Sequence, residues 1–186
     1  MRVICISAKA GAGKDTFAAM VKKELEDAGY SVLTTHYADL VKDICKRFFG
    51  WNGEKDEYGR HLMQYVGTDV GRAYNENIWV DHIADMLTMF NGQWDFVLIP
   101  DTRFPNEIEV LKNRGLSVTS VRIHRPDFQT SLTPEQLLHP SECALDHYDF
   151  DALITNDGNE AYLAEKALDF TRELFGHQIS FDEYIN

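Results

Sequence analysis

The first sixteen residues constrain the fold of this chain more than any other stretch. An apolar run at residues 3–6 leads into the small-residue segment 7–16, which contains Gly13-Lys14, and helical spacing of apolar residues follows. A strand, a loop of small residues and a helix in this order form a cradle for phosphate, because the loop amides and the helix N-terminus point at the anion. Lys14 is placed to reach the β- and γ-phosphates. The sequence therefore predicts a nucleotide-binding phosphate loop.

This loop departs from the pattern G-x-x-x-x-G-K-[ST] at two positions. Ala8 stands where the first glycine belongs, which the backbone tolerates if φ of Ala8 is negative. Asp15 replaces the Ser or Thr that binds Mg²⁺, and Thr16 follows one residue later. We take Asp15 and Thr16 as candidate metal ligands, and whether the carboxylate binds Mg²⁺ directly, through water or not at all stays open. An ordinary strand–turn–helix connection is the alternative interpretation.

Chain length and net charge limit the classes of protein to which this sequence can belong. A chain of 186 residues fits one domain with a sizeable core and a small lid. Its formal net charge of −12 argues against non-specific binding to nucleic acid or anionic membranes, because both require a basic face. The three cysteines show neither a disulfide framework nor metal spacing. Because no secretory or membrane-spanning apolar run is present, we expect a cytoplasmic protein, in the host cytoplasm if the protein is viral.

Apolar spacing predicts an α/β fold with a mostly parallel sheet and helices on both faces, because long connections separate buried strands. Strands are expected at residues 3–6, 31–36, 96–99, 118–123 and 152–154. Helices are expected after the phosphate loop as far as Gly29, at about 39–49, 60–66, 77–90 and 105–115, and over a last segment that carries Leu163 and Leu174. Asp39 is expected to cap the second helix, and Gly67-Thr68 to break or cap the third.

Two connections are long or polar enough to suggest a function. Residues 127 to about 148 form a polar segment, and a stretch of this length in a compact domain is typically an active-site lid or disordered. Residues 51–59 are interpreted either as a plain connection or as a mobile flap. His139, Ser141 and Glu142 resemble pieces of a hydrolytic site, but their close spacing disfavours a triad, whose members normally converge from distant segments.

A set of cations suits phosphoryl transfer, which depends on positioning and electrostatic stabilisation of phosphate oxygens. These residues are expected at strand ends, helix starts or loops: Lys14, Lys42, Arg60, Arg72, Arg103, Arg122 and Arg125. Asp101 and Arg103 follow the strand that ends at Ile99, so they lie beside the phosphate loop if the two strands are neighbours. An acceptor that is itself a phosphate needs no general base, and we identify no convincing one.

Several candidates have an ordinary structural interpretation as well. Lys42 is as readily a solvated helix residue, and Arg122 is better explained as a charge on the sheet surface. Tyr37 and Trp79 can stack on a base, although Trp79 also lies on the apolar stripe of its helix. Asp101 can orient Mg²⁺ through water, hold a substrate sugar or cap the following helix.

Five strings, taken together and in order, resemble the phage deoxynucleoside monophosphate kinases. They are Gly13-Lys14-Asp15-Thr16, Leu62-Met63-Gln64-Tyr65-Val66-Gly67-Thr68-Asp69, Pro100-Asp101-Thr102-Arg103, Arg125-Pro126 and Ile154-Thr155-Asn156-Asp157-Gly158. The resemblance runs from residue 1 to about 175. It implies a single P-loop kinase domain over residues 1–186, a three-layer fold with a monophosphate-binding helical region at about 37–90 and a lid at about 124–148. It also implies an enzyme that uses ATP and Mg²⁺ to convert a dNMP into a dNDP.

The resemblance assigns residues to each part of that site. For ATP it implies Ala10, Gly11, Ala12, Gly13, Lys14, Asp15 and Thr16, with Asn156, Asp157 and Gly158 on the adenine side. For the monophosphate it implies Arg60, Gln64, Gly67, Thr68, Trp79, Asp101 and Arg103, to which we add Tyr37, Lys42 and Arg72 as further candidates. Arg125 is implied to flank the transferred phosphoryl group, so Lys14, Arg103 and Arg125 are the candidate catalytic residues.

Two other functions stay open at this point. One is a P-loop kinase that acts on another small phosphorylated metabolite. The other is a non-catalytic ATP-binding module, for which Ala8 and Asp15 are the only hints. We expect a dNMP substrate, no nucleic-acid partner and no membrane. A homodimer is also open, because residues 77–90 could form either a dimer face or part of the core.

Overall fold

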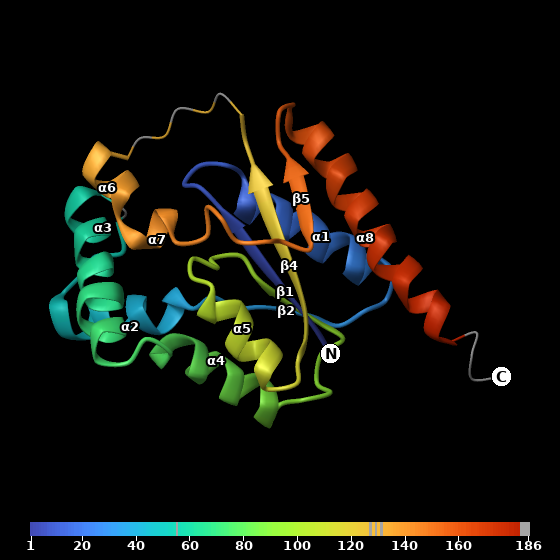
Figure 1. The fold of residues 1–186 in the computed structure, drawn as a ribbon, viewed down its shortest axis with the longest axis horizontal. Helices are drawn as coiled ribbons and strands as arrows, with labels where there is room; N and C mark the ends of the chain where they lie inside the picture. The colour runs from blue at the N-terminus through green and yellow to red at the C-terminus, as the bar shows by residue number, and fades with distance from the viewer. Residues whose placement is uncertain (55, 127, 129, 131, 183–186) are drawn as a thin grey trace.

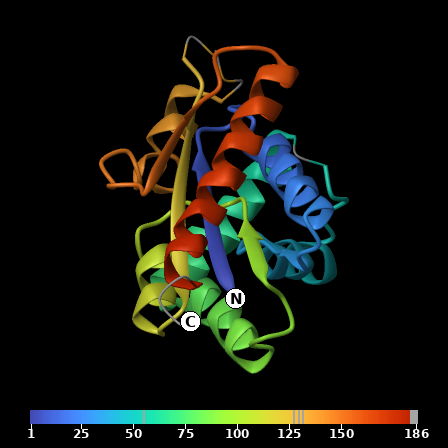
Figure 2. The ribbon, with the colours of Figure 1, turned by 90° about the vertical axis from the view of Figure 1, so that its right-hand side faces the viewer.

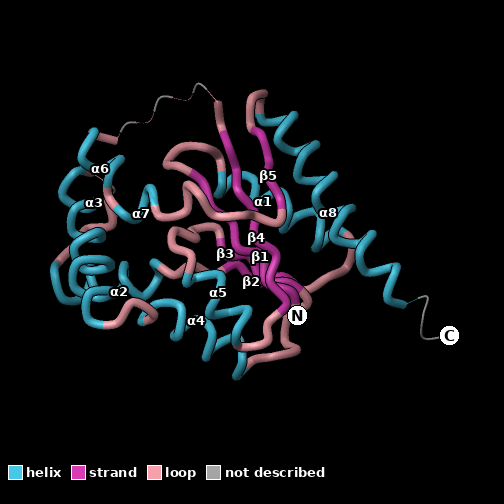
Figure 3. Tube along the Cα trace, in the orientation of Figure 1, coloured by secondary structure: helices cyan, strands magenta, loops and turns pink. Residues whose placement is uncertain are grey.

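A five-stranded parallel sheet lies at the centre of the computed structural model, which describes residues 1–54, 56–126, 128, 130 and 132–182. The strand order is β2-β3-β1-β4-β5, and all four pairings are parallel (Figures 1 and 3). The strands are β1 (Arg2–Ala8), β2 (Val32–Thr34), β3 (Phe96–Ile99), β4 (Ser117–His124) and β5 (Ala152–Thr155). The carboxyl ends of all five therefore meet at one edge, which is where parallel sheets bind ligands.

Helices cover both faces of this sheet, as the apolar strands predicted (Figure 2). One face carries α1 (Lys14–Asp27) and α8 (Glu160–Asp182), which pack against Ile4 and Ile6 of β1. Val3 and Cys5 point the other way, into a core formed with α2 (Ala38–Phe49), α3 (Glu57–Gln64), η1 (Tyr65–Arg72), α4 (Ile78–Met89) and α5 (Asn106–Asn113). Alternate side chains of one strand thus supply two cores.

The third helical segment differs from the sequence prediction, because Gly67-Thr68 does not break it. The chain continues from α3 into η1, a π-helix that runs to Arg72. Trp79 of α4 lies against this turn: its Nε1 donates to the carbonyl oxygen of Gly67 at 2.7 Å. A tertiary contact therefore supports helical backbone at a residue whose own helix propensity is low.

The cap of α2 is also different, and the prediction for Asp39 was wrong. The backbone amides of Tyr37 and Ala38 donate to the two carboxylate oxygens of Asp101, at 3.0 and 2.9 Å. Asp39 instead pairs with Lys42 at 2.8 Å. Asp101 follows β3, the strand next to β2, so the helix that leaves β2 is capped from the neighbouring strand rather than by its own first turn.

One other helix end departs from expectation. The helix expected over residues 77–90 ends at Met89, and Phe90 is 46% exposed. The last helix, α8, runs to Asp182. The remainder of α4 belongs to the core, where Ile83 and Leu87 are buried, so the core interpretation of residues 77–90 holds for most of the helix.

The long polar segment between β4 and β5 contains two short helices, α6 (Pro134–Leu138) and α7 (Pro140–Cys143). Residues 127, 129 and 131 of the expected lid lie outside the described residues, as does residue 55 of the polar connection 51–59. No helix among the described residues is long and apolar enough to cross a membrane.

Candidate active site

The phosphate loop has the backbone that its sequence predicts. Gly13 adopts φ 95° at the N-terminus of α1, a left-handed conformation that favours glycine. The Asn156 side-chain amide donates to the Ala12 carbonyl oxygen at 3.0 Å, and a Cβ added at Gly13 would lie 2.7 Å from Asn156 Nδ2. Ala8 lies in β1 and is 4% exposed, so the extended backbone accepts alanine there. Close packing therefore fixes the loop from the β5 side.

Lys14 and Asp15 are adjacent at the start of α1, with Lys14 Nζ 2.6 Å from Asp15 Oδ2. The residues Asp15 and Thr16 are exposed and offer a carboxylate and a hydroxyl, oxygen donors of the kind that Mg²⁺ prefers. No group of three or more His, Cys, Asp or Glu in the described part of the chain could hold a metal ion. A cation here would therefore depend on phosphate oxygens in addition to Asp15 or Thr16.

A cavity of about 300 Å³ joins this loop to the helices between β2 and β3. Lys14 and Asp15 line it from the phosphate loop. All ten candidate acceptor residues line it too: Tyr37, Lys42, Arg60, Gln64, Gly67, Thr68, Arg72, Trp79, Asp101 and Arg103. Arg60 and Arg103 therefore share one cavity with Lys14, and the expected placement of Arg103 beside the phosphate loop is confirmed.

Tyr37 and Trp79 are both tied to backbone groups, although both line the cavity. The Tyr37 hydroxyl donates to the carbonyl oxygen of Glu107 at 2.6 Å, and Tyr37 is 5% exposed. Trp79 is 6% exposed and donates to Gly67. Each residue therefore belongs to the core and to the cavity wall, so the two interpretations of Trp79 are compatible.

Arg72 is held rigidly in the wall of this cavity. Its guanidinium lies 3.7 Å from the centre of the Phe104 ring, and Nη2 donates to Asn106 Oδ1 at 2.5 Å. Glu107 Oε1 lies 3.4 Å from Nη1 of Arg72. Stacking and ion pairing from one short segment therefore fix the plane of the arginine.

Glu107 is a cavity residue that sequence analysis missed. Its Oε2 accepts hydrogen bonds from the amides of Arg103 and Phe104, at 2.6 and 3.1 Å, so it fixes the loop that carries Arg103. Burial raises the pKa of Glu107 to about 7, although these amides and Arg72 act in the opposite direction. In the sequence it reads as an exposed acid in the first turn of a helix, so only its spacing of four from Arg103 was a signal.

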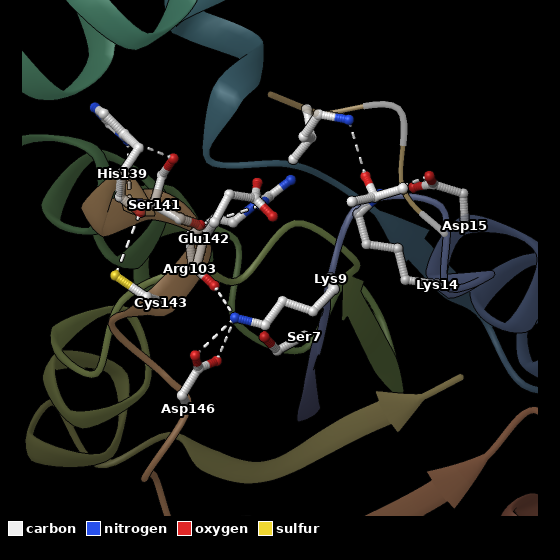
Figure 4. Close-up of polar contacts among 12 residues, drawn as sticks. Ser7, Lys9, Lys14, Asp15, Arg103, His139, Ser141, Glu142, Cys143 and Asp146 are labelled. Carbon is white, nitrogen blue, oxygen red and sulfur yellow. Dashed lines mark hydrogen bonds and ion pairs between the residues drawn. The ribbon is translucent and has the colours of Figure 1, made fainter. Parts of the chain in front are cut away.

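The cavity also has a wall from the segment before β5. Arg103 Nη1 donates to the Ser141 carbonyl oxygen at 3.1 Å and forms an ion pair with Glu142 (Figure 4). His139 Nδ1 lies 2.8 Å from Ser141 Oγ, while Glu142 is turned to Arg103. The three residues therefore do not assemble a hydrolytic triad.

The remaining candidates lie outside the cavity lining. Arg125 Nη1 donates to the Gly11 carbonyl oxygen at 3.3 Å, so it touches the phosphate loop. Arg122 projects from β4, donates to Ser7 Oγ at 2.8 Å and pairs with Asp146, and its side chain is 15% exposed. The interpretation of Arg122 as a sheet residue holds, with more burial than expected. Of the three adenine-side candidates, Asn156 is buried and hydrogen-bonded to the loop, whereas Asp157 and Gly158 are exposed.

Comparison with known proteins links this site to a family. The family model described as "Deoxynucleotide monophosphate kinase" matches residues 35–167. The deoxynucleotide monophosphate kinase of Enterobacteria phage T4 is 33% identical over 118 residues, which cover 62% of this chain and 46% of the relative. A protein of Acanthamoeba polyphaga mimivirus that carries the same name provisionally is 29% identical over 161 residues, covering 73% of this chain and 77% of the relative. The chain thus spans about half the length of the T4 protein.

Solved structures confirm the fold class at low sequence identity. A sugar kinase from a Janibacter species superposes with a TM-score of 0.51 and 16% identity, covering 90% of this chain and 92% of that one. A gluconokinase from Sinorhizobium meliloti superposes with a TM-score of 0.50 and 14% identity, covering 97% and 96%. These similarities support the α/β P-loop fold alone.

Proposed function

This chain belongs to the deoxynucleotide monophosphate kinase family, and on that premise we propose that it uses ATP to phosphorylate deoxynucleoside 5′-monophosphates to diphosphates. One observation carries the proposal: a single cavity is lined by Lys14 of the phosphate loop and by all ten candidate acceptor residues, Arg60 and Arg103 among them. Two phosphorylated ligands can meet there, because the cations needed for both converge from distant segments.

The reaction needs no base from the protein. A phosphate oxygen of the dNMP attacks the γ-phosphorus of ATP, the bond from that phosphorus to the β,γ-bridging oxygen breaks, and ADP leaves with the electron pair. Lys14 stabilises the transferring group from the donor side. Arg103 binds the acceptor phosphate from the end of β3, and Arg125 acts from the Gly11 side of the loop. Each arginine supplies a planar set of donors that suits phosphate oxygens.

The ATP site in this proposal is the loop Ala10–Thr16, closed by Asn156. Asp15 and Thr16 fit Mg²⁺ as oxygen donors beside the phosphate cradle, with the remaining ligands coming from phosphate and water. When bound, Mg²⁺ neutralises charge on the β- and γ-phosphates. The monophosphate-binding region is α2 to α4, and the β4–β5 segment with α6 and α7 is the lid of one kinase domain.

The stacking platform proposed for the nucleobase is the cavity wall with Trp79 and Tyr37. Both rings are held in place by hydrogen bonds to backbone carbonyls, so they offer fixed apolar surfaces. Arg72 is held beside them by Phe104 and Asn106. A flat, rigid ligand such as a base therefore suits this wall.

The test is an ATP-coupled assay with the four dNMPs and the purified chain of 186 residues. We expect ADP release that requires both Mg²⁺ and at least one dNMP. Ribonucleoside monophosphates and a phosphorylated sugar serve as comparison substrates for the alternative of another small-molecule kinase. Absence of turnover with every dNMP would refute the proposed function. A rise in melting temperature with ATP and Mg²⁺, to which no dNMP adds, would favour the non-catalytic binding module instead.

A further inference from the structure

Glu142 is the buried acid for which the proposed reaction gives no explanation. The residue is 9% exposed and lines the cavity from α7. Its Oε1 pairs with Arg103 Nη1, while Oε2 is buried without a hydrogen-bond partner among the described residues. Burying an unpaired carboxylate oxygen costs free energy, so a chain that retains one beside an active-site arginine calls for an explanation.

The geometry of the contact between Glu142 and Arg103 distinguishes two roles for Glu142: occupying the place of the substrate phosphate, or orienting the guanidinium. Glu142 Oε1 and the Ser141 carbonyl oxygen both accept from Nη1. Within the described residues, Nη2 and Nε of Arg103 donate to no acceptor, and the side chain is 27% exposed. A carboxylate that replaced the substrate phosphate would be expected to grip both nitrogens of the guanidinium fork. Here one terminal nitrogen is held and the other donors are left for an anion.

The turn that carries Glu142 is itself fixed at several points. His139 caps α7: its Nδ1 accepts from the Ser141 amide at 3.2 Å and lies 2.8 Å from Ser141 Oγ. The Glu142 amide donates to the His139 carbonyl oxygen at 2.8 Å. The Glu142 side chain is therefore presented from a turn with little freedom, as a positioning group requires.

Glu142 is also bound from the phosphate-loop side of the site, through Lys9. Lys9 Nζ donates to the Glu142 carbonyl oxygen at 2.6 Å and to Asp146 Oδ2 at 2.7 Å (Figure 4). Lys9 follows β1 directly and precedes the loop that is assigned to ATP. Glu142 is thus joined through its backbone to the donor side and through its carboxylate to Arg103 on the acceptor side.

We propose that Glu142 is a positioning residue that orients the Arg103 guanidinium for the acceptor phosphate and links that orientation to the phosphate loop through Lys9. This inference rests on the proposed function, because it assigns Arg103 to the dNMP phosphate. It predicts that removing the Glu142 charge impairs acceptor use through Arg103 and leaves ATP binding intact.

A double-mutant cycle with Arg103 tests the link. Glu142→Gln keeps the shape of the side chain, and we expect it to lower kcat/KM for the dNMP by about 10- to 100-fold, with KM for ATP within about twofold. In an Arg103→Ala background the same change should have less than about a twofold effect, because the group it positions is gone. Glu142→Asp should fall between wild type and Glu142→Gln. Asp149→Asn removes an exposed charge from the same segment and should leave kinetics unchanged.

Three kinetic outcomes would overturn the proposal. Equal activity of Glu142→Gln and wild type would remove any positioning role, and a higher kcat/KM would identify Glu142 as a competitor of the phosphate. Effects that multiply fully with those of Arg103→Ala would mark Glu142 as merely structural. If Glu142→Gln does not fold, as judged by its melting curve, the cycle is run with Glu142→Asp.

A readout without turnover separates this inference from the proposed function. Side-chain nitrogen NMR of isotope-labelled arginine, with the Arg103 signal assigned through Arg103→Lys, reports how freely the guanidinium rotates. We expect restricted rotation in wild type and faster rotation in Glu142→Gln. If wild type turns over no dNMP while this difference is present, the proposed function fails and the positioning contact stands. Equal rotation in both proteins would refute the positioning contact, whatever the activity.

Discussion

At the scale of single residues, Asp101 illustrates what a position in the chain can and cannot reveal. Its place after an apolar strand predicted that it lies at the ligand-binding edge, and it lines the cavity. Three roles were open for it, and the cap of the following helix was wrong: both oxygens instead hold the N-terminus of α2. The sequence could not reveal that partner, because 63 positions separate Asp101 from Ala38.

Lys14 gives the first prediction. Lys14→Ala should lower kcat by at least about 100-fold, because it removes a preorganised charge from the transferring phosphoryl group. The side chain contacts Asp15 alone among the described charged residues, so the variant should melt within a few degrees of wild type. Lys22→Ala in the same helix is the control, since Lys22 pairs with Glu26 of that helix at 3.6 Å. A folded Lys14→Ala protein with full activity would contradict the phosphate-loop mechanism.

The second prediction concerns Glu107 and the pH dependence of the free energy of unfolding. Because burial raises its pKa from 4.5 to about 7, the native state binds more protons than the unfolded state between these values. The free energy of unfolding contributed by this group is therefore fully present below pH 4.5 and declines as pH rises through 7. From pH 5 to pH 7 the decline should be about 2 kcal/mol, and Glu107→Gln should abolish it.

Urea unfolding of both proteins at pH 5, 6 and 7 measures this effect as the difference between their two pH slopes. The Asp95→Asn variant is a useful comparison, because hydrogen bonds from Ser31 lower the pKa of this exposed acid and its linkage has the opposite sign. Parallel pH profiles for wild type and Glu107→Gln would show that the carboxyl group of Glu107 is ionised normally in the folded protein.

At the scale of elements, the phosphate loop gives the third prediction. Gly13→Ala places a Cβ 2.7 Å from Asn156 Nδ2 at φ 95°, so it should both strain the loop and displace Asn156. Gly29→Ala is a matched control: φ is 91°, and nothing lies within 4 Å of the added atom. We expect Gly29→Ala to cost about 1 kcal/mol and to keep the ATP-induced rise in melting temperature. Gly13→Ala should lose that rise, and an unchanged rise would mean that the loop does not bind ATP.

Local patterns predicted the regular elements well. Periodic apolar residues placed all five strands and most helices, because burial on two faces leaves a clear signal in β1 and β3. The π-helix η1 was missed for a physical reason: local propensity at Gly67 favours a break, and a contact from Trp79, twelve residues away, stabilises helical backbone there instead. Helix ends such as that at Phe90 were also less predictable than helix interiors.

At the scale of the whole molecule, the sequence predicted the meeting of two cation groups at one sheet edge. Buried runs and long connections predicted a mostly parallel sheet, although not its strand order, and Lys14, Arg60 and Arg103 do share a cavity. What it could not predict were the acids that pair with Arg72 and Arg103, which are Glu107 and Glu142. Glu107 lies in the first turn of a helix and Glu142 in a polar segment. The neighbouring sequence does not indicate that either is buried, because their burial depends on residues far away in the chain.

One cavity that accommodates two phosphorylated ligands is the central claim, and a bisubstrate ligand tests it most directly. In such a ligand, adenosine and a deoxynucleoside are joined at their 5′ positions through five phosphates. Calorimetry should give one site per chain and a Kd at least about 100-fold below that of ATP or dNMP alone, because linked ligands bind with high effective concentration. Lys14→Ala and Arg103→Ala should each weaken this binding. A Kd no lower than that of ATP alone would mean that the phosphate loop and the arginines do not form one site, and the account would be wrong.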